Sequence, residues 1–280
     1  MSGASPVLEA LDAPAHIGCV TLMVHRLDEV AGFYEKVIGL TVSTASAERV
    51  SLGTTDGTVL IRLVHAPDQP AAQARAPGLF HTAFLLPTRR DLANWMAHAH
   101  EFRVQIEGAS DHLVSEAIYL SDPEGNGIEV YVDRKRADWP REAGMIKMAT
   151  LPLDEASLVA ERDVKASGWR FPAGGRVGHI HLKVGDLAAA EAFYVETLGL
   201  TVMARYPGAS FMGWGGYHHH VAINVWQSRH APRRENGTNG LAEFEIMLDT
   251  RRTPARPVTA GEDPSGNRFT IGSQPAEGLS

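Results

Sequence analysis

The chain has 280 residues, of which 44% are hydrophobic, so it can build one large or two smaller cores and is not expected to be globally disordered. Its net charge of −7 provides no basic surface for nucleic acid or anionic lipid, and we expect a small-molecule or protein partner instead. With one cysteine, Cys19, no membrane-length apolar run and no secretory signal, the sequence predicts a cytoplasmic protein.

From the N-terminus onward, the chain shows an internal repeat. Residues 17–24 read IGCVTLMV and residues 177–184 read VGHIHLKV, while residues 33–40 read FYEKVIGL and residues 193–200 read FYVETLGL. Both pairs are separated by 160 positions. In each copy an alternating apolar pattern predicts a strand, a helical stripe follows it, and short β-rich segments come next.

A second kind of unit follows each copy of the first. Residues 78–86 (GLFHTAFLL) and 240–248 (GLAEFEIML) are the predicted first strands of these units. The turns DPEGN at 122–126 and DPSGN at 263–267 precede their last strands. Because the last unit has almost no helical segment, we predict an α+β chain of four βαβββ modules with a truncated fourth module.

The spacing of the modules suggests two domains. Residues 15–135 would hold modules one and two, and residues 177–275 would hold modules three and four. Residues 136–176 form the expected linker, with one short helix. In the third module, Asp186 is the expected N-cap of the helix and Gly199 ends it.

The strand motif [HC]-x-x-L-x-V and the helix end FY-x-x-x-[IL]-GL resemble those of the vicinal oxygen chelate (VOC) superfamily, which includes glyoxalase I, bleomycin resistance proteins and extradiol dioxygenases. The segments GLFHTAFLLP, SEAIYLSDPEGNGIEVY and GGYHHHVAINVW are most similar to two-domain bacterial catechol 2,3-dioxygenases. The resemblance implies paired modules that curl into a cup around a divalent metal. It also implies a role in aromatic hydrocarbon catabolism and assembly into a homo-oligomer.

The resemblance places metal ligands on the first strand of a module and on the last strand of one module. The residues at these positions are Cys19, His81, His179 and Glu243 on first strands and Glu129 and Thr270 on last strands. The complete triad is His81, Glu129 and His179, which requires modules two and three to pair across the linker. Two imidazoles and a carboxylate suit non-haem Fe(II) and leave positions for substrate and O₂.

Each of these residues also has a structural interpretation. A lone histidine on an apolar strand is often a hydrogen-bonded core residue, and Glu129 would face solvent if its strand were half exposed. Within the run GIEVYV, however, an inward carboxylate is costly unless it is paired or bound to metal. We read Cys19 as a small buried residue rather than as a zinc ligand.

Ring opening also needs acid–base groups, and histidine is suited to this because its pKa lies near neutral pH. On a strand, His219 would face one way and its two histidine neighbours the other. The spacing typical of extradiol enzymes selects His219 as the acid–base residue, with His220 as the fallback. Tyr119 and His112 match the family's substrate-contacting tyrosine and supporting histidine, although the spacing of His112 is slightly short.

The sequence therefore predicts an oxidoreductase of the extradiol dioxygenase class, acting on catechol-type diols with Fe(II) and O₂. A metal-dependent, glyoxalase-like isomerase or transferase is one alternative, because it uses the same cup. A metal-free protein that sequesters a small molecule is the other, since Trp214, Trp226, Phe211 and Tyr206 could line a pocket.

Overall fold

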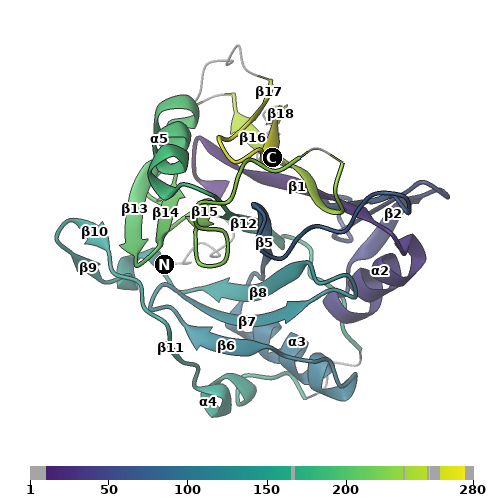
Figure 1. Ribbon diagram of the computed structural model, residues 1–280. Helices are drawn as coiled ribbons and strands as arrows, with labels where there is room; N and C mark the ends of the chain where they lie inside the picture. The colour runs from purple at the N-terminus through teal and green to yellow at the C-terminus, as the bar shows by residue number, and fades with distance from the viewer. Residues whose placement is uncertain (1–10, 165–167, 236, 251, 253–258, 275–280) are drawn as a thin grey trace.

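The computed structural model describes residues 11–164, 168–235, 237–250, 252 and 259–274. Most of its strands form two curled sheets, and Figure 1 shows helices α2, α3 and α5 at the periphery of the molecule. The predicted mixed α+β class is confirmed. None of the described helices is both long and apolar enough to cross a membrane.

The first sheet has seven strands and joins the two ends of the described chain. Its order is β17-β18-β16-β1-β4-β3-β2. The strands are β1 (Ala15–Val24), β2 (Thr41–Ala45), β3 (Arg49–Gly53), β4 (Val59–His65), β16 (Gly240–Asp249), β17 (Ala260–Glu262) and β18 (Arg268–Gln274). β1 pairs in parallel with β4 and antiparallel with β16, so that strands from the first and fourth predicted modules share this sheet.

The second sheet has nine strands and is built from the middle of the chain. Its order is β11-β6-β7-β8-β5-β12-β15-β14-β13. The strands are β5 (Gly78–Leu85), β6 (Gly108–Asp111), β7 (Ser115–Ser121), β8 (Gly127–Asp133), β11 (Leu151–Pro152), β12 (Arg176–Lys183), β13 (Thr201–Tyr206), β14 (Ala209–Gly213) and β15 (Val221–Asn224). β5 and β12 pair antiparallel at its centre, and they join the second and third predicted modules. Each predicted domain thus contributes strands to both sheets.

Helices connect the first and second strands of the first three units. They are α2 (Leu27–Phe33), continued by a π-helical turn η1 (Tyr34–Ile38), then α3 (Arg89–Glu101) and α5 (Leu187–Leu198). The linker carries a 3₁₀ turn η2 (Arg136–Asp138), a small hairpin of β9 (Arg141–Glu142) and β10 (Met145–Ile146), and the short helix α4 (Glu155–Val159). As expected, the Asp186 side chain accepts hydrogen bonds at the start of α5, and Gly199 ends it with φ of 71°.

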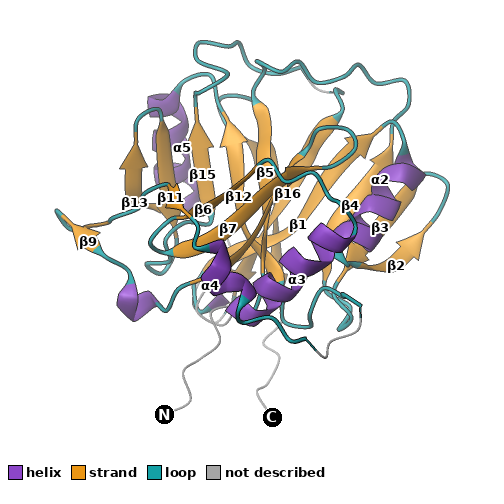
Figure 2. Cartoon of the chain, turned by 90° about the horizontal axis from the view of Figure 1, so that it is seen from below, coloured by secondary structure: helices purple, strands orange, loops and turns teal. Residues whose placement is uncertain are grey.

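The two sheets meet in the middle of the molecule, where β1 packs against β12 and β16 against β5 (Figure 2). One buried apolar cluster contains side chains from both sheets, such as Val20 from β1 and Ile180 from β12. The outer face of the nine-stranded sheet contributes to this cluster through Phe84 and Val130. Because side chains alternate along a strand, the residues between these positions face the inside of the cup.

The tyrosine of the FY motif contacts the DP-x-GN turn, and both motifs occur twice in the sequence. The Tyr34 hydroxyl donates to Asp122 Oδ2 at 3.4 Å, and the Tyr194 hydroxyl donates to Asp263 Oδ2 at 3.1 Å. Each aspartate also accepts from an asparagine four residues later, at the end of its DP-x-GN turn. The FY motif of one unit is therefore anchored to the turn of the next unit, and the same contact occurs twice.

Candidate metal centre

Three strands of the nine-stranded sheet direct their alternate side chains into one cup. On β8 these residues include Glu129, and on β5 and β12 they include His81 and His179. All three side chains are buried, with 2% to 7% of their surface exposed. The pairing of β5 with both β8 and β12 brings residues far apart in sequence to neighbouring positions.

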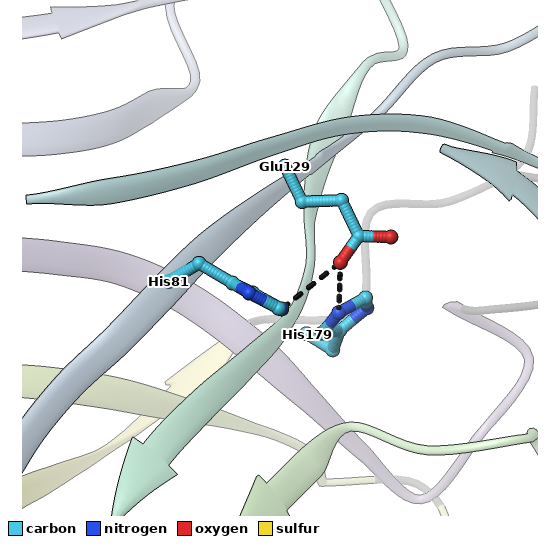
Figure 3. Close-up of side chains that lie close together, drawn as sticks. All are labelled: His81, Glu129 and His179. Atoms are coloured by element: carbon cyan, nitrogen blue, oxygen red, sulfur yellow. Dashed lines mark hydrogen bonds and ion pairs between the residues drawn. The ribbon is translucent and has the colours of Figure 1, made fainter. Parts of the chain in front are cut away.

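The three predicted ligands converge on one point, as Figure 3 shows. Glu129 Oε2 lies 2.9 Å from His81 Nε2 and 3.0 Å from His179 Nε2. One ligand atom from each residue lies within 4.8 Å of the other two. These atoms come from both sides of the linker, so the pairing of β5 with β12 is what assembles the group.

The hydrogen bonding leaves one ligand atom unsatisfied. His179 Nε2 is hydrogen-bonded to Glu129 Oε2, but His81 Nε2 is buried without a hydrogen-bond partner despite its short distance to the same oxygen. A buried polar atom without a partner is costly. A cation among the three atoms would satisfy it, so the donor set fits a divalent metal held by two imidazoles and one carboxylate.

The electrostatics favour the protonation states that a metal needs. Burial alone would raise the pKa of Glu129, but His179 and His81 hold it well below its usual value, so the carboxylate is ionised. Burial lowers the pKa of His179 to about 4 against the opposing effect of Glu129, so this imidazole is neutral near pH 7.

A glycine beside His179 allows two strands of the cup to pack closely. A Cβ atom at Gly178 would overlap the hydroxyl of Tyr131 on β8. The pairing of β12 with β5 is irregular at the same position, between Val177 and His179. Gly178 therefore permits β12 to approach β8 closely enough for His179 to meet Glu129.

His219 lies beside the triad and belongs to a chain of polar groups. Its ring centroid is 4.1 Å from that of His179, and its Nδ1 is 2.7 Å from His218 Nδ1. His218 Nε2 lies 2.7 Å from Asp133 Oδ1, and the Tyr217 hydroxyl donates to Asp133 Oδ2 at 2.7 Å. This leaves His219 Nε2 as the nitrogen that is not engaged by another described residue.

The histidine run differs from the strand that its sequence predicted. β15 starts only at Val221, and residues 218–220 are an irregular segment with bends at 218 and 220. His218 and His219 consequently face each other instead of opposite sides. The fallback residue His220 points away from the triad: its Nδ1 accepts from the Trp214 backbone N–H at 3.2 Å, and it does not line the cavity.

Tyr119 and His112 form a second polar pair across the cup. The Tyr119 hydroxyl lies 2.6 Å from His112 Nε2, and His112 Nδ1 lies 2.7 Å from the Ala149 carbonyl oxygen. Because a carbonyl only accepts, Nδ1 carries the hydrogen, and Nε2 of the neutral ring accepts from the tyrosine. Burial and the neighbouring Glu129 raise the pKa of Tyr119 well above 10. Tyr119 therefore stays protonated.

A cavity of about 560 Å³ connects these groups. The triad, Tyr119, His112 and His219 all line it. Among the aromatic residues suggested from the sequence, Phe211, Tyr206 and Trp226 also line it, whereas Trp214 does not and is buried in the core. This volume is suited to a small aromatic molecule.

Two polar residues near the triad were missed from the sequence, His181 in the cavity wall and Asp133 behind His218, whereas Cys19 was identified correctly. His181 follows His179 by two residues, a strand spacing that signals a shared face, and it lines the cavity. Glu129, Tyr131 and Asp133 likewise occupy alternate positions on β8, which signals that Asp133 shares a face with Glu129. Cys19 is 3% exposed, and burial raises the pKa of its thiol to about 12, in agreement with the small buried residue that was expected.

Comparisons with known proteins agree with this architecture. The sequence matches the family described as Glyoxalase/Bleomycin resistance protein/Dioxygenase superfamily over residues 15–130 and 176–245. It is 37% identical over 246 residues to a protein of Bacillus subtilis (strain 168) named catechol-2,3-dioxygenase, covering 86% of this chain and 85% of that protein.

Solved structures show the same fold at low sequence identity. Glyoxalase I from Zea mays has a TM-score of 0.54 at 14% identity, and the match covers 94% of each chain. The cppA protein from Streptococcus pneumoniae TIGR4 has a TM-score of 0.57 at 11% identity, covering 94% of this chain and 99% of that one. These likenesses concern the arrangement of strands and helices.

Proposed function

Because the chain belongs to the glyoxalase/bleomycin resistance protein/dioxygenase superfamily, we propose that it is an extradiol dioxygenase that opens catechol-type rings with Fe(II) and O₂. The observation that carries the proposal is the buried convergence of His81, Glu129 and His179 at the wall of an aromatic-lined cavity. The similarity to a catechol-2,3-dioxygenase over most of both chains supports this chemistry among those of the superfamily.

The triad would hold the iron through two neutral imidazoles and one ionised carboxylate. When bound, Fe(II) supplies a centre that brings the diol and O₂ together and allows electrons to pass between them. The protein keeps the three ligands away from bulk solvent, because each of them is at most 7% exposed. Exclusion of water strengthens the electrostatic interactions within the cavity.

Tyr119 and His112 are placed to receive a proton from the diol. Since the Tyr119 hydroxyl donates to His112 Nε2, its oxygen lone pairs are available to a substrate hydroxyl on the cavity side. As a diol proton reaches the Tyr119 oxygen, the hydrogen that the hydroxyl already donates to His112 Nε2 would move onto that nitrogen, so Tyr119 stays neutral and His112, whose Nδ1 is held by the Ala149 carbonyl, carries the positive charge. This arrangement favours a proton-accepting role for Tyr119 toward the neutral diol.

His219 is placed to exchange a proton on the other side of the cavity. Its Nε2 is unengaged, while its Nδ1 contacts His218, which Asp133 holds in place. A histidine supported by a second histidine and a carboxylate can accept a proton at Nε2. It can later donate this proton to the leaving-group oxygen of the substrate. We assign this acid–base step to His219 rather than to His220, which lies outside the cavity.

The proposal is tested by loading the purified protein with Fe(II) under anaerobic conditions, adding catechol and admitting air. We expect the yellow ring-opened product, followed by its visible absorbance, with one O₂ consumed per ring. The Glu129→Gln variant, loaded with Fe(II) in the same way, is the control. Iron-loaded wild type that consumes no O₂ with catechol, or instead isomerises the methylglyoxal–glutathione adduct, would contradict the proposal.

A further inference from the structure

The inner face of β12 continues beyond the metal ligand toward the rim of the cavity. His179, His181 and Lys183 occupy alternate positions on this strand, and all three line the cavity. At about 3.3 Å per residue, His181 lies about 7 Å and Lys183 about 13 Å along the strand from His179. The wall thus carries two further polar groups at increasing distance from the proposed metal position.

The geometry fixes which nitrogen of His181 carries its hydrogen. The Trp226 backbone N–H donates to Asn224 Oδ1 at 3.1 Å, which orients the amide of Asn224. Asn224 Nδ2 then faces His181 Nε2 at 2.9 Å. Because the amide nitrogen only donates, Nε2 must be the bare nitrogen and Nδ1 must carry the hydrogen. His181 is therefore a neutral donor through Nδ1.

The surroundings of His181 leave this donor for a ligand. The side chain is 3% exposed, and the rings around it, with centroids 4.8 to 5.9 Å away, are those of Phe80, His81, Phe211 and Trp226. No described residue accepts a hydrogen bond from Nδ1. An acceptor that enters the cavity lined by His181 would satisfy this donor.

Lys183 adds a positive charge farther along the same wall. Its Nζ donates to the Ala74 carbonyl at 3.1 Å, and among the described residues no carboxylate lies within 4.0 Å of it. Arg234 is close enough to act with burial in lowering the pKa of Lys183. Arg234 and Lys183 also line a second hollow of about 520 Å³ that adjoins the cavity at Leu79 and Gly125. Lys183 and Arg234 therefore bring two positive charges to this end of the wall, while Glu124 also lines the second hollow and Asp263 acts on Arg234.

We propose that the substrate is a catechol with a short side chain ending in a carboxylate, which accepts a hydrogen bond from His181 Nδ1 and pairs with Lys183. The inference rests on the proposed ring-cleaving function and specifies its substrate. A side chain of one to three carbons spans the distance from a ring at the triad to these donors. The aromatic side chains around His181 would enclose the apolar part of that chain.

The test compares 3,4-dihydroxyphenylpropionate with 4-ethylcatechol, which lacks the carboxylate. For the Fe(II)-loaded wild type we expect kcat/KM to be about 10- to 100-fold higher for the acid, the range for a hydrogen bond or ion pair to a charged group. Lys183→Met and His181→Phe should each lose most of that ratio. Lys36→Met, which removes an exposed lysine on η1, should retain it.

A binding measurement separates this inference from the proposed function. Calorimetric titration of metal-free protein with 3-phenylpropionate, which has no diol, should give binding for wild type and at least 10-fold weaker binding for Lys183→Met. Equal kcat/KM values for the two catechols, or a preference for the acid that survives in Lys183→Met, would overturn the inference. If neither catechol is cleaved, the proposed function fails, and the titration alone decides whether the carboxylate site exists.

Discussion

Replacing Glu129 with glutamine tests the metal centre with little change in side-chain size. The variant loses the negative charge that lies 2.9 Å from His81 Nε2 and 3.0 Å from His179 Nε2. Altering a residue that merely supports a metal ligand typically weakens binding 10- to 100-fold. Loss of the ligand's charge should therefore weaken Fe(II) binding by at least about 100-fold, or about 2.7 kcal/mol.

Anaerobic titration calorimetry measures this loss directly, and thermal unfolding measures it independently. At a free Fe(II) concentration about 1,000 times the wild-type Kd, bound metal stabilises the wild type by about 4.1 kcal/mol. A variant with 100-fold weaker affinity keeps only about 1.4 kcal/mol of that stabilisation under the same conditions. Circular dichroism of both metal-free proteins should be the same, because the replacement keeps the shape of the side chain.

Glu116→Gln is the matched control. Glu116 is also a buried glutamate, 4% exposed, but it pairs with Arg89 at 2.6 Å and Arg134 at 3.2 Å away from the triad. This variant should lose about 1–2 kcal/mol of stability, because Arg89 and Arg134 each lose one of two carboxylate partners and keep Glu161 and Asp111, and it should keep its Fe(II) affinity. Wild-type Fe(II) affinity in Glu129→Gln would refute the ligand assignment.

Three further predictions concern the surroundings of the triad. His219→Ala should keep Fe(II) affinity within a few-fold but lower kcat for catechol by about 10²- to 10⁴-fold, and a wild-type kcat in stopped-flow assays would remove His219 from the acid–base role. Gly178→Ala should cost about 1–3 kcal/mol in urea unfolding because its Cβ meets the Tyr131 hydroxyl, whereas Gly108→Ala, with no atom within 4 Å of the added Cβ, should cost far less; equal losses would contradict the close packing. The pKa of His179 falls from 6.5 to about 4 on folding, so the unfolded chain takes up a proton first as the pH falls. The stability of the metal-free protein, complete above pH 6.5, should therefore decline by up to about 3 kcal/mol toward pH 4, and a His179→Gln variant with an unchanged pH dependence in urea unfolding would disprove this contribution.

Much of the fold was predictable because the repeat is visible in the amino-acid sequence. The 160-residue offset and the alternation around His81 and His179 predict the first strands of the units, and Asp186 and Gly199 correctly mark the ends of α5. The combination of His81, Glu129 and His179 predicted that the second and third units share a sheet, since neighbouring units within each half lack a full ligand set. In the structure β5 and β12 do pair.

The remaining features depend on contacts between distant segments. Three consecutive histidines before a valine-rich run look like part of a strand, but His218 turns toward Asp133, 85 positions away. The donor tautomer of His181 depends on the orientation of Asn224, which Trp226 fixes from the end of β15. Alternation along β12 could have identified His181 as a cavity residue, but not which of its nitrogens carries the hydrogen.

The pairing of β1 with β16 has a consequence for the newly made protein. Residues 15–24 leave the ribosome long before residues 240–249 are synthesised, so one side of β1 lacks its antiparallel partner during most of translation. An open strand edge of this kind can pair with other chains. The triad likewise stays incomplete until residue 179 has emerged, which prevents the full ligand set from capturing a cation on a half-made chain. We therefore expect products truncated before residue 179 to aggregate rather than to accumulate as metal-loaded fragments.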